Sequence, residues 1–218
     1  MKKLTTASIA LVCVATFLVA AQAVTSKNIV GYNKTVLKGG LQLLGTSFIK
    51  TNATPDTIFG DRLPLGSKVY FYNGVGYNIA EYFQSPVTGN RGWDNSFDIG
   101  QGEAYWVEVP AGTMTNLLSG EVETADAVTN TVATGLQLFA FPYPVEMTPQ
   151  TLGFAPTIGD KIYYYNGTGY NIAKYILGVT GITAWNNDFT IPVGMGFWYE
   201  SHASSNTLWI AERPFDVD

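Results

Sequence analysis

Two stretches of the chain share a pattern of apolar and polar positions that is typical of β-hairpins. Lys68–Tyr72 and Lys161–Tyr165 are rich in β-branched and aromatic residues, and each is followed by Asn-Gly. Asn-Gly is the strongest short hairpin signal because both residues tolerate the positive φ of a type I′ turn. A second glycine two positions later indicates a bulged or four-residue loop. We therefore expect return strands at residues 77–83 and 170–176.

This hairpin signal belongs to a longer internal repeat. Residues 65–83 and 158–176 are identical at twelve of nineteen aligned positions. The correspondence continues through Gly-Leu-Gln-Leu (40–43 and 135–138), through Trp93 and Trp185, and through two strand-like segments (103–109 and 195–201). Self-similarity of this kind indicates a repeated structural unit. We predict two tandem homologous units of about 95 residues, at 24–123 and 124–218.

Both units carry the signals of a small all-β domain. Glycine- and asparagine-rich turns separate short strands, and no long amphipathic helix is apparent. Thr54-Pro55 and Thr148-Pro149 each match an N-cap followed by proline at the first helical position, which predicts one short helical turn per unit. The predicted fold class is all-β, with each unit a small β-sandwich or barrel. Because the polar linker at 122–130 is short and a unit of this size has a marginal core, we expect the units to pack together.

The first residues follow the grammar of a secretory signal. Lys2 and Lys3 precede an apolar run at 9–21, and Ala21-Gln22-Ala23 is a small-x-small cleavage pattern. The run is shorter than the ~20 residues that a membrane-spanning helix needs. We predict a signal peptide at 1–23, no membrane span after its cleavage, and a secreted protein located outside the cell or at the cell surface.

Composition narrows the classes of function. The only cysteine, Cys13, lies within the predicted signal peptide, so the exported chain has neither disulfides nor thiolate chemistry. Charged residues make up 13% of the chain and aromatic residues 14%, and the formal net charge is −5. An acidic surface with few charges argues against nucleic acid or an anionic membrane as a partner, because both require clusters of Lys and Arg.

The order of the repeated motifs resembles that of a known family. Asn-Ile-Val-Gly-Tyr at 28–32 is followed by Gly-Leu-Gln-Leu, by Gly-Asp-Lys-Ile-Tyr-x-Tyr-Asn-Gly-x-Gly-Tyr, by a tryptophan and by Gly-x-Gly-Phe-Trp-Tyr-Glu. This order is similar to that of a functionally uncharacterised family of small secreted bacterial proteins with a duplicated β unit. The resemblance covers essentially the whole exported chain and implies a secreted β protein, with no active-site residues to transfer. Ala104 departs from the pattern, because it replaces the second glycine of Gly-x-Gly in the first unit.

Three side chains are the main candidates for catalysis. Glu108 and Glu200 occupy equivalent positions two residues after a tryptophan, so each carboxylate shares a strand face with an indole. If they faced one another across a symmetry axis, they could form the carboxylate pair of a glycan hydrolase. Alternatively, they lie in solvent or pair with lysine. His202, the only histidine, has no counterpart in the first unit, so we interpret it as an exposed loop residue rather than part of a Ser-His-acid triad.

Metal and cofactor signals are weak. Zinc requires clusters of His and Cys, which this sequence lacks. The paired glycines lie in hairpins rather than between a strand and a helix, so they do not form a phosphate-binding loop. The loops at 93–98 and 185–190 are rich in Asp and Asn and could offer oxygens to calcium, but such residues also form turns by themselves. We predict no metal and no cofactor.

The repeated aromatic residues next to turns are the candidate ligand-binding residues. They are Tyr77, Trp93, Tyr170 and Trp185. A flat ring near a turn can stack on a sugar or on a partner protein. Alternatively, the two tryptophans fill the open end of each β core.

The functional hypothesis that follows is a secreted, non-enzymatic structural or interaction protein. Its partners would be other copies of itself or other cell-surface components. The alternative is a carbohydrate-binding module that uses the aromatic residues near the repeated turns to hold polysaccharide. A hydrolase that depends on the two glutamates is the third hypothesis.

Overall fold

The computed structural model describes residues 29–217, so the predicted signal peptide at 1–23 lies outside the described part of the chain. The first unit contains β1 (Val30–Gly45), the short helix α2 (Pro55–Phe59), β2 (Lys68–Tyr72), β3 (Tyr77–Gln84), β4 (Arg91–Trp93) and β5 (Ala104–Glu121). The second unit contains β6 (Ala127–Val132), β7 (Gly135–Ala140), β8 (Lys161–Tyr165), β9 (Tyr170–Leu177), β10 (Thr183–Trp185), β11 (Gly196–Ser201) and β12 (Thr207–Glu212).

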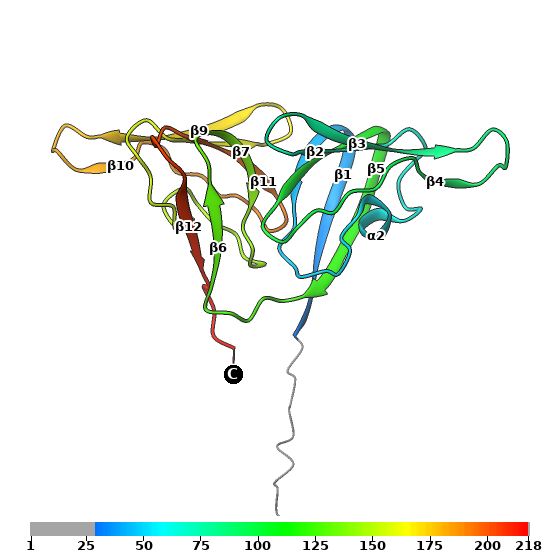
Figure 1. The fold of residues 1–218 in the computed structure, drawn as a ribbon, viewed down its shortest axis with the longest axis horizontal. Helices are drawn as coiled ribbons and strands as arrows, with labels where there is room; N and C mark the ends of the chain where they lie inside the picture. The colour runs from blue at the N-terminus through cyan, green and yellow to red at the C-terminus, as the bar shows by residue number, and fades with distance from the viewer. Residues whose placement is uncertain (1–28, 218) are drawn as a thin grey trace, which may run out of the picture.

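The strand order confirms that the fold is all-β and built from two tandem units. The five-stranded sheet of the first unit has the order β1-β5-β2-β3-β4, and that of the second has the matching order β7-β11-β8-β9-β10. The units lie side by side, and their β3–β4 and β9–β10 hairpins extend in opposite directions along the longest axis (Figure 1). We call these two hairpins the wings. Within residues 29–217, no helix is long and apolar enough to cross a membrane.

The units differ mainly in their longest strands, which are continuous in the first unit and divided in the second. In the first unit β1 and β5 run as one antiparallel pair, with a register shift between Lys38 and Gly40. In the second unit the same path is divided, so that β7 pairs with β11 and β6 pairs with β12 as a separate two-stranded ribbon. The sequence predicted the first part of β5 and the whole of β11. It did not predict β1 or the β6–β12 ribbon, because exposed and half-buried residues alternate there without a strong apolar signal.

The hairpin loops differ in detail from the type I′ turns that Asn-Gly predicts. Each is a four-residue loop closed by a bond from the Asn73 amide to the Gly76 carbonyl, or from Asn166 to Gly169. In the described residues only Asn52 has a positive φ among non-glycine residues, so Asn73 and Asn166 cannot form type I′ turns. The type I′ prediction is therefore wrong, and the four-residue loop is confirmed. Each asparagine side chain instead accepts hydrogen bonds from the backbone amides two and three residues further along its loop.

The predicted helical turn forms fully only in the first unit. Thr54 caps α2 through a capping box with Thr57, and Pro55 stands at its start. In the second unit Thr151 and Leu152 donate backbone bonds to the Thr148 carbonyl, which makes a turn but not a helix. Helix propensity alone could not predict that only the first unit forms a helix. A helix of five residues is stabilised by its packing rather than by its intrinsic stability.

Each unit has its own apolar core on the inner face of its sheet. Phe59, Ile99 and Tyr105 are almost completely buried in the first core, and Tyr143, Phe197 and Trp209 in the second. Aromatic side chains dominate the second core, where the Phe154 ring stacks between Tyr199 at 4.1 Å and Trp209 at 4.5 Å between centroids. Large aromatic side chains thus supply much of the buried area in residues 29–217, which contain no cysteine.

A third apolar cluster joins the two units on the outer faces of their sheets. Two equivalent pairs, one residue from each unit, form most of its buried part: Leu43 with Leu138, and Trp106 with Trp198. Ala104 from the first unit and Ala140 from the second, which occupy different positions of the repeat, complete it. Aromatic contacts cross reciprocally, since Tyr72 meets Trp198 at 5.4 Å and Tyr165 meets Trp106 at 5.2 Å. Reciprocal contacts between equivalent residues define a pseudo-twofold axis between the units.

The backbones approach one another closely at this axis. A Cβ atom added to Gly45 would lie 2.2 Å from the Cβ of Ala140, which is its counterpart in the second unit. A Cβ added to Gly196 would lie 2.4 Å from that of its own counterpart, Ala104. Two symmetric backbone bonds use this closeness, from the Gly45 amide to the Gly194 carbonyl at 2.9 Å and from Ala140 to Gly102 at 2.7 Å. The axis therefore has room for one methyl group at each of two levels.

We expect Gly45→Ala to destabilise the protein by about 1–3 kcal/mol, because two methyl groups would overlap at the axis. Adding Ala140→Gly should recover part of this loss, since it removes the opposing methyl group while the Met195 carbonyl stays 3.0 Å from the new Cβ. Urea unfolding monitored by tryptophan fluorescence measures both effects. Gly92→Ala is the control, because nothing lies within 4 Å of a Cβ at that position. Equal stability of Gly45→Ala and the control would contradict this account of the axis.

Candidate functional site

Strand register places aromatic side chains from both units in rows that meet at the axis. In the first unit Leu43, Trp106 and Tyr70 are direct neighbours across β1, β5 and β2. In the second unit the equivalent residues are direct neighbours across β7, β11 and β8: Leu138, Trp198 and Tyr163. Directly paired residues point to the same face of a sheet, so both rows lie on the outer faces.

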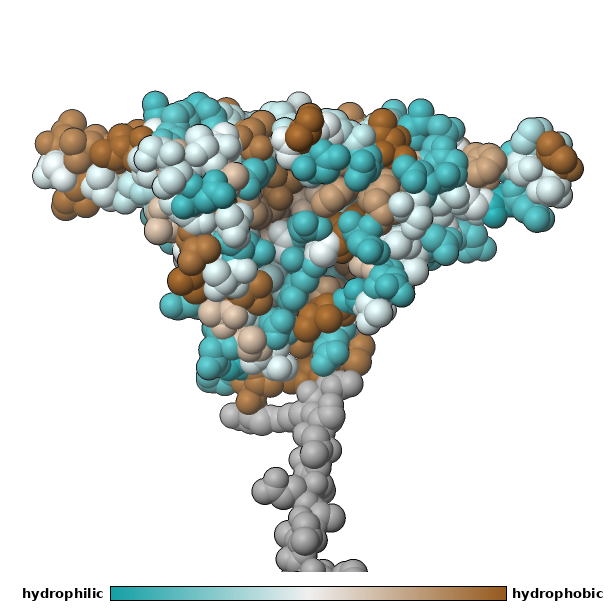
Figure 2. Space-filling model, in the orientation of Figure 1, coloured by the Kyte–Doolittle hydropathy of each residue, from teal (hydrophilic) through white to brown (hydrophobic). Residues whose placement is uncertain are grey.

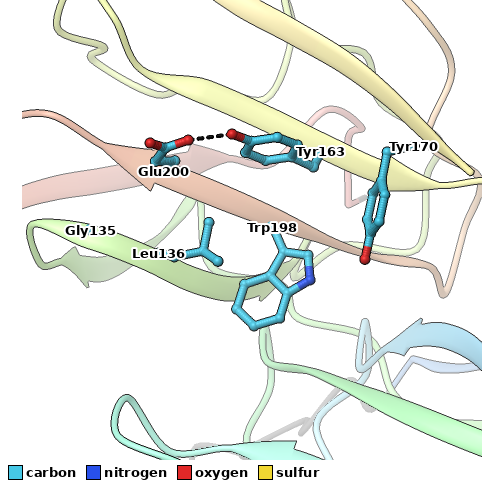
Figure 3. Close-up of a pocket in the computed structure, with 6 residues that line it drawn as sticks. All are labelled: Gly135, Leu136, Tyr163, Tyr170, Trp198 and Glu200. Carbon is cyan, nitrogen blue, oxygen red and sulfur yellow. Dashed lines mark hydrogen bonds between the residues drawn. The ribbon is translucent and has the colours of Figure 1, made fainter.

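These rows line two adjoining hollows on the surface. A central hollow of about 360 Å³ is lined by Leu41, Tyr70, Tyr77, Trp106, Tyr170 and Trp198. A second hollow of about 540 Å³ lies over the second unit and is lined by Gly135, Leu136, Tyr163, Tyr170, Trp198 and Glu200 (Figure 3). Tyr170 and Trp198 line both, so the hollows are continuous. We call them together the aromatic trough.

Tyr77 and Tyr170 are the most accessible aromatic residues of the trough. They are 45% and 46% exposed, whereas Trp106 and Trp198 are 9% and 8% exposed. Both tyrosines line the central hollow, and burial, followed by the charge of Tyr170, raises the pKa of Tyr77. The tryptophans thus form the floor, and the rings of the two tyrosines are open to solvent.

Trp93 and Trp185 lie elsewhere. The Trp93 indole packs against the first core, 6.0 Å from Phe59, and donates a hydrogen bond to the Gly60 carbonyl at 3.1 Å. Trp185 is 8% exposed and belongs to the second core, where it meets Tyr175. Of the four candidate ligand-binding residues, the structure brings Tyr77 and Tyr170 together and separates both tryptophans from them.

In the Asp- and Asn-rich loops at 93–98 and 185–190, side-chain oxygens accept hydrogen bonds from the backbone. The Asp94 carboxylate accepts from the Glu81 amide at 2.7 Å, and the Asn186 side chain accepts from the Lys174 amide at 2.8 Å. Equivalent side chains in the two units therefore tie the loops to β3 and β9. Within the described part of the chain, no group of three His, Cys, Asp or Glu side chains is placed to hold a metal ion.

The two symmetric glutamates lie one in each unit, and we call their positions the two ends of the trough region. Glu200 lines the second hollow, and Glu108 contacts Tyr70, which lines the central hollow. Glu108 accepts a hydrogen bond from the Tyr70 hydroxyl, and Glu200 accepts one from the Tyr163 hydroxyl. Glu200 also accepts from the Lys161 ammonium at 2.9 Å. The Tyr163 hydrogen bond, and then Lys161, lower the pKa of Glu200, while burial and the bond to Glu108 raise the pKa of Tyr70 to about 12. The lowered pKa favours an ionised Glu200, which is a hydrogen-bond acceptor rather than an acid catalyst.

His202 contacts two carboxylates on the second unit only. Its Nε2 lies 3.5 Å from Glu200 and its Nδ1 lies 3.7 Å from Asp160. Asp160 is 1% exposed and accepts from the Tyr199 hydroxyl at 2.6 Å. Among the residues that the structure describes, no serine or threonine hydroxyl is hydrogen-bonded to the His202 ring, as a Ser-His-acid triad would require.

The sequence did not point to four of the aromatic residues that line the trough, namely Tyr70, Trp106, Tyr163 and Trp198. The available signal was their spacing: each tryptophan precedes its glutamate by two residues, and each tyrosine follows Lys68 or Lys161 by two. That spacing places them on one strand face, but only register and the packing of the units place both faces at one site.

Comparison with known protein families, with curated proteins and with solved structures found no match to this chain. The resemblance to small secreted bacterial proteins therefore stays a prediction from the motifs. The trough has to be interpreted from its own geometry and charges.

We expect Glu200→Gln to lower stability at neutral pH but not in acid. A carboxylate whose folded-state pKa is lowered stabilises the folded protein above its unfolded pKa of about 4.3, and this contribution disappears as the pH falls through the folded value. Thermal melts of the wild type and the variant should therefore differ at pH 7 and converge near pH 3. Glu212→Gln, an exposed position with no side-chain hydrogen bond or ion pair in the described residues, should follow the wild type at both pH values. A pH-independent gap would refute the assignment.

Proposed function

We propose that this protein is an exported, non-enzymatic binding protein that holds a glycan chain in the aromatic trough. One observation carries the proposal: equivalent tyrosines of the two units, Tyr77 and Tyr170, converge on one open surface above a floor of two tryptophans. The flat C–H faces of sugar rings stack on the electron-rich faces of aromatic rings. Polar groups at the edges of such a site then orient the ligand.

Two features favour binding over catalysis. Glu200 is held by Tyr163 and Lys161 and has a lowered pKa, which is unsuited to proton donation. Glu108 is held by Tyr70, whose pKa is raised. Fixed carboxylates at the border of an aromatic surface are suited to accepting hydrogen bonds from sugar hydroxyl groups.

The location outside the cell is proposed from the sequence. The secretory pattern at 1–23 and the resemblance to secreted bacterial proteins support export. A chain with few charged and many aromatic residues suits a protein that binds polysaccharide at the cell surface.

Replacing either exposed tyrosine tests this function. We expect Tyr77→Ala and Tyr170→Ala each to weaken the binding of β-1,4-linked hexasaccharides by roughly tenfold, because each removes a stacking ring worth about 1–1.5 kcal/mol. Isothermal titration calorimetry measures the binding of cello-, chitin and chitosan hexamers. Tyr77→Phe should retain binding, and Tyr32→Ala, at an exposed position on the lower part of β1, should have no effect. If the wild-type protein binds none of the three hexamers, the glycan proposal is wrong.

The tips of the wings favour a second candidate function, which is assembly with other copies of the chain. Residues 177–182 form an uncharged β9–β10 tip with Leu177, Val179 and Ile182 exposed, and Val87 is 90% exposed at the β3–β4 tip. These apolar tips lie at the two ends of the longest axis (Figures 1 and 2). Sites at opposite ends can join molecules in a row, which would suit a structural component of the cell surface.

Val179→Asp tests assembly, because a charge at a fully exposed tip disrupts an apolar contact without touching either core. We expect sedimentation velocity to show concentration-dependent oligomers for the wild type and a monomer for the variant. Thr180→Ser, at the same tip, is the matched control and should sediment like the wild type. A wild-type protein that stays monomeric over the full concentration range would exclude this second function.

A further inference from the structure

The two ends of the trough region carry opposite charge, although the units are homologous. In the first unit Lys68 lies between Glu108 on β5 and Glu81 on β3, as direct register neighbours. In the second unit the equivalent Lys161 lies between Glu200 on β11 and Lys174 on β9. The first set of three has one excess negative charge, and the second has one excess positive charge.

This single exchange redirects the central lysine. Lys68 forms its ion pair with Glu81, at 3.4 Å. Lys161 has a lysine where Glu81 would be, and its ammonium forms an ion pair with Glu200 instead, at 2.9 Å. Like charges repel across the β8–β9 pair, so the lysine is displaced toward the carboxylate on its other side.

The two symmetric glutamates are consequently not equivalent as ligand-binding groups. One Glu200 oxygen receives bonds from Tyr163 and Lys161, and the other lies 3.5 Å from His202. In the described residues Glu108 receives one hydrogen bond, from Tyr70, and forms no ion pair. Glu108 thus keeps an uncompensated charge and a free oxygen, and it shares its strand face with Trp106.

We propose that the glycan held in the trough carries protonated amino groups and that an amino group binds at Glu108, in one orientation along the trough. This inference rests on the glycan-binding function proposed above. An ammonium group is stabilised there by a charge-assisted hydrogen bond to the Glu108 carboxylate, whose second oxygen the Tyr70 hydroxyl leaves free. At the opposite end the exposed Lys174 repels it, so the charges of the two units select both the ligand class and its direction.

The test compares hexamers of β-1,4-linked glucosamine and N-acetylglucosamine, which share the same backbone and differ in whether each amino group is free to be protonated or is acetylated. Isothermal titration calorimetry at pH 5.5 and low salt should show the wild type binding the free-amine hexamer about tenfold more tightly, as one charge-assisted hydrogen bond provides. Glu108→Gln should abolish this preference while keeping affinity for the acetylated hexamer. Glu200→Gln should keep the preference.

A variant at Lys174 tests whether the charge at this position is the reason that the two glutamates differ. Lys174→Glu restores to the second unit the carboxylate that the first unit has, so Lys161 should turn toward it and release Glu200. We expect this variant to increase the preference for the free-amine hexamer by a further several-fold, whereas Lys174→Gln should give a smaller increase.

Failure of the amino-glycan inference and failure of the proposed glycan binding give different results. If the acetylated hexamer binds at least as tightly as the free-amine form, the amino-glycan inference is wrong and glycan binding stands. If Glu200→Gln removes the preference and Glu108→Gln does not, the assignment of the two ends is wrong. If neither hexamer nor a cellulose hexamer binds, both proposals fail together.

Discussion

The close approach of two backbones at the pseudo-twofold axis is the constraint on which the rest of the structure depends. At each of two levels one glycine faces one alanine, Gly45 against Ala140 and Gly196 against Ala104. Interiors are packed too densely to absorb a second methyl group at either level. This closeness allows the tyrosine of each unit to reach the tryptophan of the other, and it brings two homologous outer faces together as one continuous aromatic surface.

The same arrangement explains why the units have diverged at particular places. Two identical units would present the same residue on both sides of the axis, giving two methyl groups at one level or none at another. A fused pair can hold one of each, which is the physical reason that Ala104 departs from the Gly-x-Gly pattern of the second unit. Duplication within one chain thus permitted a contact that a symmetric dimer of either unit could not form equally well.

The two units share the residues that pack at their interface but differ in the charged residues of their outer faces. The same aromatic residues occur at the interface in both units because the tyrosine of each unit packs against the tryptophan of the other. Charges on the outer face are free to change, since half-exposed side chains meet solvent as well as one another. Glu81 and Lys174 occupy equivalent positions with opposite sign, and Asp160, buried with Tyr199, stands where the first unit has Ser67. A nearly symmetric scaffold therefore carries an electrically asymmetric site.

The sequence by itself determined the β class, the repeat and the central hairpins, because these depend on local alternation and on turn residues. The bounds of β2 and β8 follow directly from the runs before Asn-Gly. It also identified Tyr77 and Tyr170 as repeated aromatics near turns, and Glu108 and Glu200 as symmetric carboxylates. Only the tertiary structure decided which aromatics share a surface, which tryptophans fill a core, and which glutamate a lysine neutralises. Those outcomes depend on register between distant strands and on how two units pack, and both are set by long-range contacts that no local pattern encodes.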